Sequence, residues 1–259
     1  MGNPRKRLST LYWQSMKKHV AAWLAVLILL FGTYIVGHIG YQKIRPNSVT
    51  KPARTTHETP TQPAGFNKKL YVLDDPSSLW VVVNKQRPLN PKTYAPTDLS
   101  PIGNGQKMRL AAANQLKLLF DAAKSASYTL IAESGYRSYR TQVSVYNHEV
   151  SAFGQTKADS ESARPGYSEH QTGWAVDIGS PGCYEDCFGT KPASKWLLAN
   201  AYRYGFILRY PVDKSTITGY RNEPWHFRYV GVDLAAELHN TRTETLEEFF
   251  GLPAAPNYP

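Results

Sequence analysis

An uncharged apolar run near the N-terminus places the strongest limit on how this chain can fold. It reads VAAWLAVLILLFGTYIVG from Val20 to Gly37, and no Lys, Arg, Asp or Glu occurs between Lys18 and Lys43. A helix rises about 1.5 Å per residue, so this run with a few flanking residues spans a hydrocarbon core roughly 30 Å thick. The run is apolar on every face, which disfavours a buried helix of a soluble domain. We therefore expect a transmembrane anchor over residues 20–42.

The residues before this run predict its orientation. The first 19 residues carry five basic side chains and no acidic one, so the positive-inside rule assigns residues 1–19 to the cytoplasm. A cleavable signal peptide is the alternative, but the run is long for such a segment and no A-x-A cleavage site follows it. We expect a single-pass protein of the cell membrane whose larger part is extracytoplasmic.

The positive charge of the chain is concentrated at its N-terminal end. The 259 residues hold 30 Lys and Arg against 20 Asp and Glu, a formal charge of +10. Residues 1–69 contain 11 of the basic side chains and one acid, which leaves 19 of each sign for residues 70–259. A basic nucleic-acid-binding domain is therefore disfavoured, and no nucleic-acid partner is expected. Residues 43–69 contain four prolines and few large apolar side chains, which predicts a flexible linker.

The neutral remainder, residues 70–259, is long enough for one domain with its own core. Apolar residues at helical spacing predict helices at 108–124, 138–153, about 193–204 and within 233–250. Runs of β-branched and aromatic residues predict strands at 79–85, 128–134, 174–178, 206–210 and 225–231. Because strands and helices do not alternate regularly, we expect an α+β fold, a small antiparallel sheet with flanking helices, preceded by the transmembrane helix.

Two segments of this domain offer residues that suit a metal site. His170 and Asp177 lie on either side of Gly173, where a turn can fold the histidine toward the face on which Asp177 lies. In a second strand, alternation places His226 on the face opposite the apolar side chains. Two imidazoles and one carboxylate form a three-ligand set suited to Zn²⁺, with a fourth position for water. Taken singly, each histidine is also compatible with a structural role.

A carboxylate near such a metal can act as a general base. Glu223 precedes His226 by three residues, and Pro224 interrupts regular strand pairing, so Glu223 is free to lie beside the site. It is the candidate to take a proton from the attacking water and pass it to the leaving amine. His148 and Glu149 begin an H-E-x-x-H motif that fails at Ala152.

These segments resemble a known family. The pattern S-x-H-x-x-G-x-A-x-D from Ser168 to Asp177, followed by E-x-W-H from Glu223 to His226, is similar to the zinc D,D- and L,D-carboxypeptidases of the VanY-like group. Members of this group trim peptidoglycan stem peptides. The segments SGYRSYRTQ (134–142) and VVVNKQRPL (81–89) extend the resemblance, which covers roughly residues 79–231. It implies that one zinc ion is bound by His170, Asp177 and His226. It also implies that Glu223 is the catalytic base.

The resemblance also implies a substrate cleft. Arg137 matches the family's arginine there, and its planar fork suits either the carboxylate of a terminal D-alanine or the oxyanion formed during attack. Ser168 matches a serine that hydrogen-bonds substrate, and Gln142 is a further candidate for the same cleft. We expect a membrane-anchored zinc carboxypeptidase that removes the C-terminal D-amino acid from stem peptides. The preference between D,D and L,D bonds and between tetra- and pentapeptides stays open.

Two other functions fit parts of the pattern. A peptidoglycan endopeptidase of the same fold would use the same ligands and base. A non-catalytic wall-binding or sensor module is disfavoured, because a binding module needs no general base.

Two cysteines follow the second segment. Cys183 and Cys187 form a C-x3-C pair without the further ligands of a structural zinc site. Outside the cytoplasm we expect a local disulfide that shapes the loop, with two free thiols as the alternative.

Overall fold

A four-stranded antiparallel sheet forms the centre of residues 67–259, the part of the chain that the computed structural model describes. Its strand order is β3-β4-β6-β5, with the bounds Ile131–Ser134, Ala175–Gly179, His226–Tyr229 and Phe206–Leu208. The predicted stub 1–19, the predicted anchor 20–42 and linker residues 43–66 lie outside the described residues. Between residues 67 and 259, no helix is long and apolar enough to cross a membrane.

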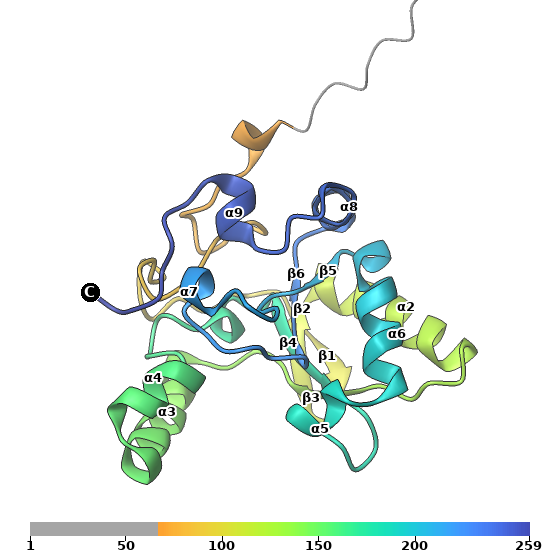
Figure 1. Cartoon of the computed structure of the whole chain (residues 1–259), viewed down its shortest axis with the longest axis horizontal. Coiled ribbons are helices and arrows are strands. Elements are labelled where there is room, and N and C mark those ends of the chain that lie inside the picture. The colour runs from red at the N-terminus through yellow and green to blue at the C-terminus, as the bar shows by residue number, and fades with distance from the viewer. Residues whose placement is uncertain (1–66) are drawn as a thin grey trace, which may run out of the picture. The chain divides into compact units, whose positions relative to one another are not determined.

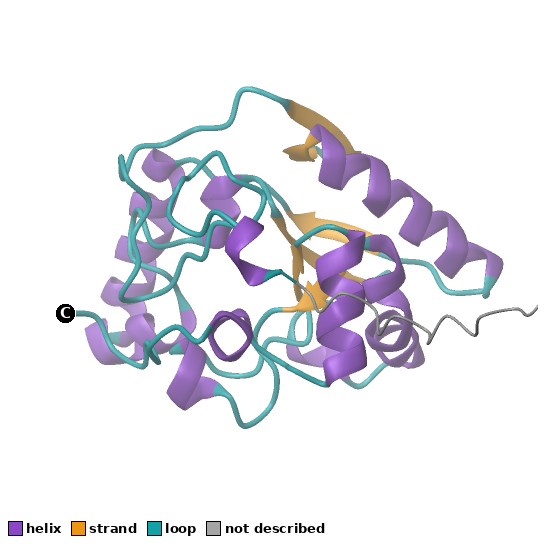
Figure 2. Ribbon diagram, turned by 90° about the horizontal axis from the view of Figure 1, so that it is seen from above, coloured by secondary structure: helices purple, strands orange, loops and turns teal. Residues whose placement is uncertain are grey.

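Helices surround this sheet (Figure 1). They are α2 (Leu110–Ser125), α3 (Tyr139–Phe153), α4 (Gln155–Glu161), α5 (Asp186–Gly189), α6 (Pro192–Asn200), α7 (Ser215–Thr218), α8 (Val232–Thr241) and α9 (Leu246–Phe250). Single 3-10 turns lie at η1 (Lys68–Leu70), η2 (Glu169–Thr172) and η3 (Ala201–Tyr204). Figure 2 shows how much of the chain between these elements is loop. The α+β class with a small antiparallel sheet is confirmed.

The core face of the sheet follows the predicted alternation. In β4, Val176 and Ile178 are fully buried in the main core cluster, as is Phe227 in β6, and Trp174 and Tyr229 join them. Helix α2 packs on the same cluster through Leu116, Leu119 and neighbouring alanines. Because successive strand residues point to opposite faces, this packing leaves Asp177 and His226 on the face away from the core.

A short hairpin precedes α2 where the sequence predicted a loop followed by helix. Strands β1 (Leu99–Gly103) and β2 (Gln106–Arg109) pair antiparallel around Asn104 and Gly105, which both have positive φ (51° and 72°). An Asn-Gly pair favours this turn because both residues tolerate the left-handed region. Met108, expected on the helix, is therefore a buried strand residue.

The predicted strand at 79–85 is wrong, although its valines are buried. Val81 and Val83 pack into the main core cluster and Val82 into a second one. The carbonyl oxygens of Leu79 and Val81 accept hydrogen bonds from the Arg228 guanidinium at 2.8 and 2.9 Å. A buried side chain thus takes the place that a neighbouring strand would fill.

Four fully buried charged side chains connect the sheet to η2 and α9. Arg209 Nε donates to Glu169 Oε1 at 2.9 Å, and its two terminal nitrogens bind both oxygens of Glu247 at 2.9 and 2.7 Å. Arg228 Nη1 donates to the same Glu169 oxygen at 3.0 Å. All four have no exposed side-chain surface. Two carboxylates and two guanidinium groups therefore balance in charge where no water is available.

We predict that Arg209→Met destabilises the protein strongly, because it leaves two buried carboxylates without their main partner. The expected loss in the free energy of unfolding is about 3–5 kcal/mol, measured by urea denaturation followed by far-UV circular dichroism. The matched control is Lys117→Met, which removes a cation whose ion pair with Asp121 is exposed. Equal denaturation midpoints for the two variants would contradict the prediction.

Candidate metal and catalytic site

Three predicted ligands converge on the face of the sheet away from the core. The metal-binding atoms of His170, Asp177 and His226 lie within 4.8 Å of one another, and all three residues are buried. Asp177 and His226 are direct partners in the pairing of β4 with β6. His170 lies on η2, which ends at Gly173 in the left-handed conformation (φ 75°), and this turn brings the histidine back toward β4.

The distances from Asp177 to the two histidines are close to those around a tetrahedral ion. His170 Nε2 lies 3.3 Å from Asp177 Oδ2, and His226 Nδ1 lies 3.1 Å from Asp177 Oδ1. Two donors that each lie about 2.0 Å from a tetrahedral centre are about 3.3 Å apart. Asp177 Oδ1 is buried and makes no hydrogen bond. Such an orphaned carboxylate oxygen, 3.1 Å from His226 Nδ1, fits a zinc ion.

Each histidine is held by its second nitrogen. His170 Nδ1 lies 2.7 Å from the carbonyl oxygen of Gly135, to which the Nδ1–H tautomer donates. His226 Nε2 lies 3.3 Å from Glu169 Oε2. These contacts leave His170 Nε2 and His226 Nδ1 for the metal, and hydrogen bonds of this kind orient metal-binding histidines.

Glu169 is the functional residue that the sequence reasoning missed. Burial opposes its charged form, but Arg209 and Arg228 outweigh burial and lower the pKa of this carboxyl. It therefore stays ionised and accepts from His226. The signal in the sequence was the presence of the two arginines within predicted core strands, since buried guanidinium groups require a buried carboxylate.

Glu223 lies beside the three ligands. Its Oε2 is 3.7 Å from His226 Nδ1, and its backbone N–H donates to the Tyr210 carbonyl at 3.0 Å. Burial raises the pKa of Glu223 to about 8. A carboxyl group with a pKa near neutrality is suited to accept and return a proton.

The pKa values of the three ligands do not all shift in the same direction. Burial lowers the pKa of His170, which favours the neutral, metal-binding form. For His226, burial acts in the same direction, but the nearby carboxylates of Asp177 and Glu169 outweigh it and raise the pKa to about 9. Burial also opposes the charge on Asp177, yet the two histidines lower the pKa of its carboxyl.

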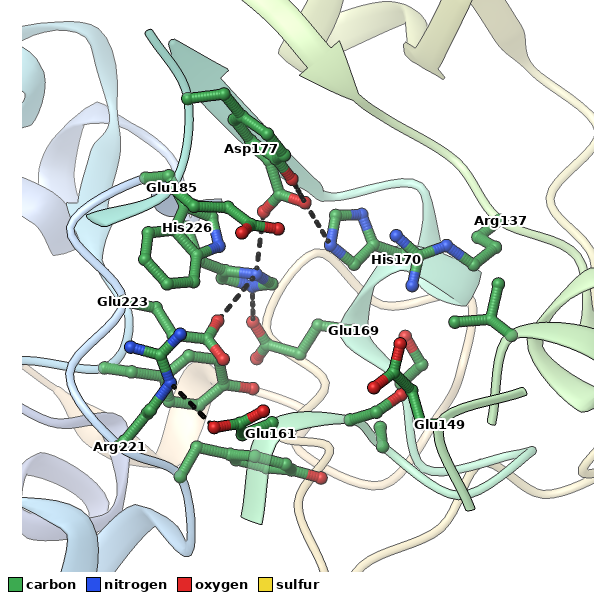
Figure 3. A pocket seen from close by; sticks show the side chains of 18 of the residues that line it. Arg137, Glu149, Glu161, Glu169, His170, Asp177, Glu185, Arg221, Glu223 and His226 are labelled. Carbon is green, nitrogen blue, oxygen red and sulfur yellow. Dashed lines mark hydrogen bonds and ion pairs between the residues drawn. The ribbon is translucent and has the colours of Figure 1, made fainter. Parts of the chain in front are cut away.

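These groups line a cavity of about 390 Å³ (Figure 3). Arg137 contributes to one wall, and its guanidinium donates to Ser134 Oγ at 2.9 Å and to Gln142 Oε1 at 3.1 Å. Its backbone N–H donates to the His170 carbonyl at 3.1 Å, which fixes the arginine next to a ligand. Ser168 is buried and also lines the cavity.

Gln142 has a different place from the one predicted. Its side chain is fully buried, it is not among the residues lining the cavity, and its amide donates to the Ala163 carbonyl at 2.7 Å. It therefore holds the Arg137 guanidinium through a hydrogen bond from a position outside the cavity.

The disulfide predicted between Cys183 and Cys187 is present. The ring it closes contains Tyr184 and Glu185, which both line the cavity. Tyr184 Oη donates to Asp177 Oδ2 at 3.3 Å, and desolvation raises the pKa of this phenol, so it remains a hydrogen-bond donor. The loop thus adds a polar contact to a ligand carboxylate.

Comparison with known proteins supports the assignment of these residues to a carboxypeptidase site. The family model for VanY, D-alanyl-D-alanine carboxypeptidase, matches residues 105–232. The chain is 45% identical over 193 residues to "Putative carboxypeptidase YodJ" of Bacillus subtilis, with 70% of each chain covered.

Solved structures agree with this match. The LD-carboxypeptidase LdcB is 45% identical with a TM-score of 0.63, covering 68% of this chain and 87% of that one. A mutant of the vancomycin-resistance D,D-pentapeptidase VanY in complex with Zn(II) is 36% identical with a TM-score of 0.59, covering 68% and 99%. With the ligand geometry in place and the match spanning most of the described domain, the chain belongs to the VanY family of D-alanyl-D-alanine carboxypeptidases.

Proposed function

We propose that this protein is a zinc carboxypeptidase that removes the C-terminal D-amino acid from peptidoglycan stem peptides. The observation that carries this proposal is the convergence of three ligands, a carboxyl group with a raised pKa and an arginine on one cavity. The names of the similar proteins include both D,D and L,D activities. The bond that this chain prefers is decided by the wall around the penultimate residue of the peptide.

The proposed zinc ligands are His170, Asp177 and His226. When bound there, zinc lowers the pKa of a water molecule and polarises the scissile carbonyl group. Glu223 takes the proton of the attacking water and returns it to the amine of the departing D-amino acid. Arg137, held by Ser134 and Gln142, binds either the terminal carboxylate of the substrate or the oxyanion that forms during attack.

We predict that Glu223→Gln and His170→Ala separate catalysis from metal binding. Glu223→Gln should retain one zinc per chain and lose at least about a hundredfold in the release of D-alanine, because the amide cannot accept a proton. His170→Ala should lose both zinc and activity. Zinc is measured by elemental analysis and D-alanine by mass spectrometry.

His148→Ala is the matched control for the histidine, since His148 is exposed on α3 and outside the cavity. Full activity in Glu223→Gln would exclude the proposed base. Unchanged zinc content in His170→Ala would exclude the proposed ligand.

The endopeptidase alternative makes a different use of Arg137. If the guanidinium binds a free terminal carboxylate, amidating the C-terminus of a stem peptide should reduce turnover at least about tenfold. The measurement compares free and amidated pentapeptides at equal concentration, and Arg137→Ala should abolish the difference. Equal turnover of the two substrates, with cleavage at an internal bond, would support the endopeptidase.

We further propose that residues 20–42 anchor residues 70–259 on the outer side of the cell membrane through the linker 43–69. Support comes from the apolar run and from the basic residues before it. A flexible linker of this length has a reach on the order of 30 Å, which allows the catalytic domain to contact the wall.

For the anchor, we predict that the full chain stays in the membrane pellet after an alkaline carbonate wash. A variant without residues 1–42 should be recovered in the soluble fraction. External protease added to cells without their wall should digest residues 70–259 of the full chain. Release of the full chain by carbonate would contradict the anchor, and protection from external protease would contradict the orientation.

A further inference from the structure

The segment Leu252–Pro259 crosses two loops that border the cavity. It lies outside residues 105–232, which the family model matches. In Figure 1 it runs from α9 past α7 to the end marked C. We call it the strap. Ala255 is fully buried, and its backbone N–H donates to the Ile217 carbonyl at 2.8 Å, so the strap is seated on the domain.

On one side the strap contacts the loop after α4. Ser162, Ala163 and Ser168 of this region line the cavity. Tyr258 Oη accepts a hydrogen bond from the Arg164 backbone N–H at 2.8 Å, and the Arg164 guanidinium lies 4.2 Å from the centre of the Tyr258 ring. The Tyr167 ring packs against the same ring in a T-shaped pair, with 5.1 Å between the ring centres.

On the other side the strap contacts the loop after α7. Tyr220 and Arg221 of this loop line the cavity. The hydroxyl oxygens of Tyr220 and Tyr258 are 3.1 Å apart. Gly219 allows this close approach, because an added Cβ would lie 2.4 Å from the Ala255 carbonyl oxygen. One phenol oxygen thus connects two loops that both line the cavity. An ion pair between Arg221 and Glu161, at 3.7 Å, joins the same two regions on the cavity side.

A buried lysine also depends on the strap. Lys85 is 4% exposed, and its Nζ donates to the Pro256 carbonyl at 3.3 Å. The same ammonium group lies 4.8 Å from the ring centre of Tyr220 and 5.5 Å from that of Tyr258. The strap therefore covers the Lys85 ammonium group, which would otherwise face solvent. The hydrogen bond from this group to Pro256 in turn holds the strap in place.

We propose that the strap fixes the relative position of two adjacent loops that line the substrate cleft, and that Tyr258 is the positioning residue that joins them. The proposal rests on the proposed function for the identity of the substrate. Tyr258 does not line the cavity and contacts neither the metal ligands nor Glu223. Its loss should therefore weaken substrate binding and leave the chemical step intact.

The test compares Tyr258→Ala, Tyr258→Phe and wild type with a stem pentapeptide. In Tyr258→Ala, KM should rise about tenfold, with kcat within about twofold and zinc content unchanged. Tyr258→Phe retains the ring and loses the hydroxyl, so its KM should be intermediate. The matched control is Tyr202→Ala, since Tyr202 stacks on His239 and lies outside the cavity.

A second measurement does not depend on activity. Amide hydrogen exchange in Tyr258→Ala should become faster at residues 162–168 and at residues 217–221, and should stay unchanged in β6. Unchanged exchange in both loops, or a loss of kcat without a change in KM, would overturn the proposal. If wild type releases no D-alanine from any stem peptide, the proposed function fails, and the exchange measurement still decides the role of the strap.

Discussion

The geometry of the site depends on one carboxylate with no exposed surface. Oε1 of Glu169 accepts from Arg209 and from Arg228, which leaves Oε2 for His226. Without these two guanidinium groups, burial would favour the protonated form of Glu169. A neutral carboxyl group is a weaker hydrogen-bond acceptor for the imidazole N–H than a carboxylate. The orientation of a proposed ligand is therefore determined by charges that lie within the core and reach as far as α9.

Much of the site could be predicted because strand alternation is a strong constraint. Once Val176 and Phe227 occupy the core, Asp177 and His226 have only the opposite face available. The positions of His170 and Glu223 followed less directly, since each depends on a turn, at Gly173 or before Pro224, whose geometry the pattern suggests without defining it. The disulfide between Cys183 and Cys187 was predictable from the expected compartment alone.

What sequence reasoning missed depends on contacts between distant residues. The segment 79–85 has the composition of a strand, but its carbonyl groups bind the guanidinium of Arg228, almost 150 residues away in the chain. Gln142 was a candidate for the cleft, yet its hydrogen bonds to Arg137 and Ala163 place it behind the residues that line the cavity. The role of Glu169 likewise depends on its contacts with Arg209 and Arg228, which lie far from it in the sequence.

The pairing of Asp177 with His226 distinguishes this site from those of small zinc domains. In small zinc domains the ligands come together only when the ion binds, so folding and metal uptake are one event. Here the hydrogen-bonded register of two central strands already sets two ligands side by side, and the Gly135 carbonyl orients the third. Main-chain pairing, rather than the ion, therefore sets the spacing of two of the proposed ligands.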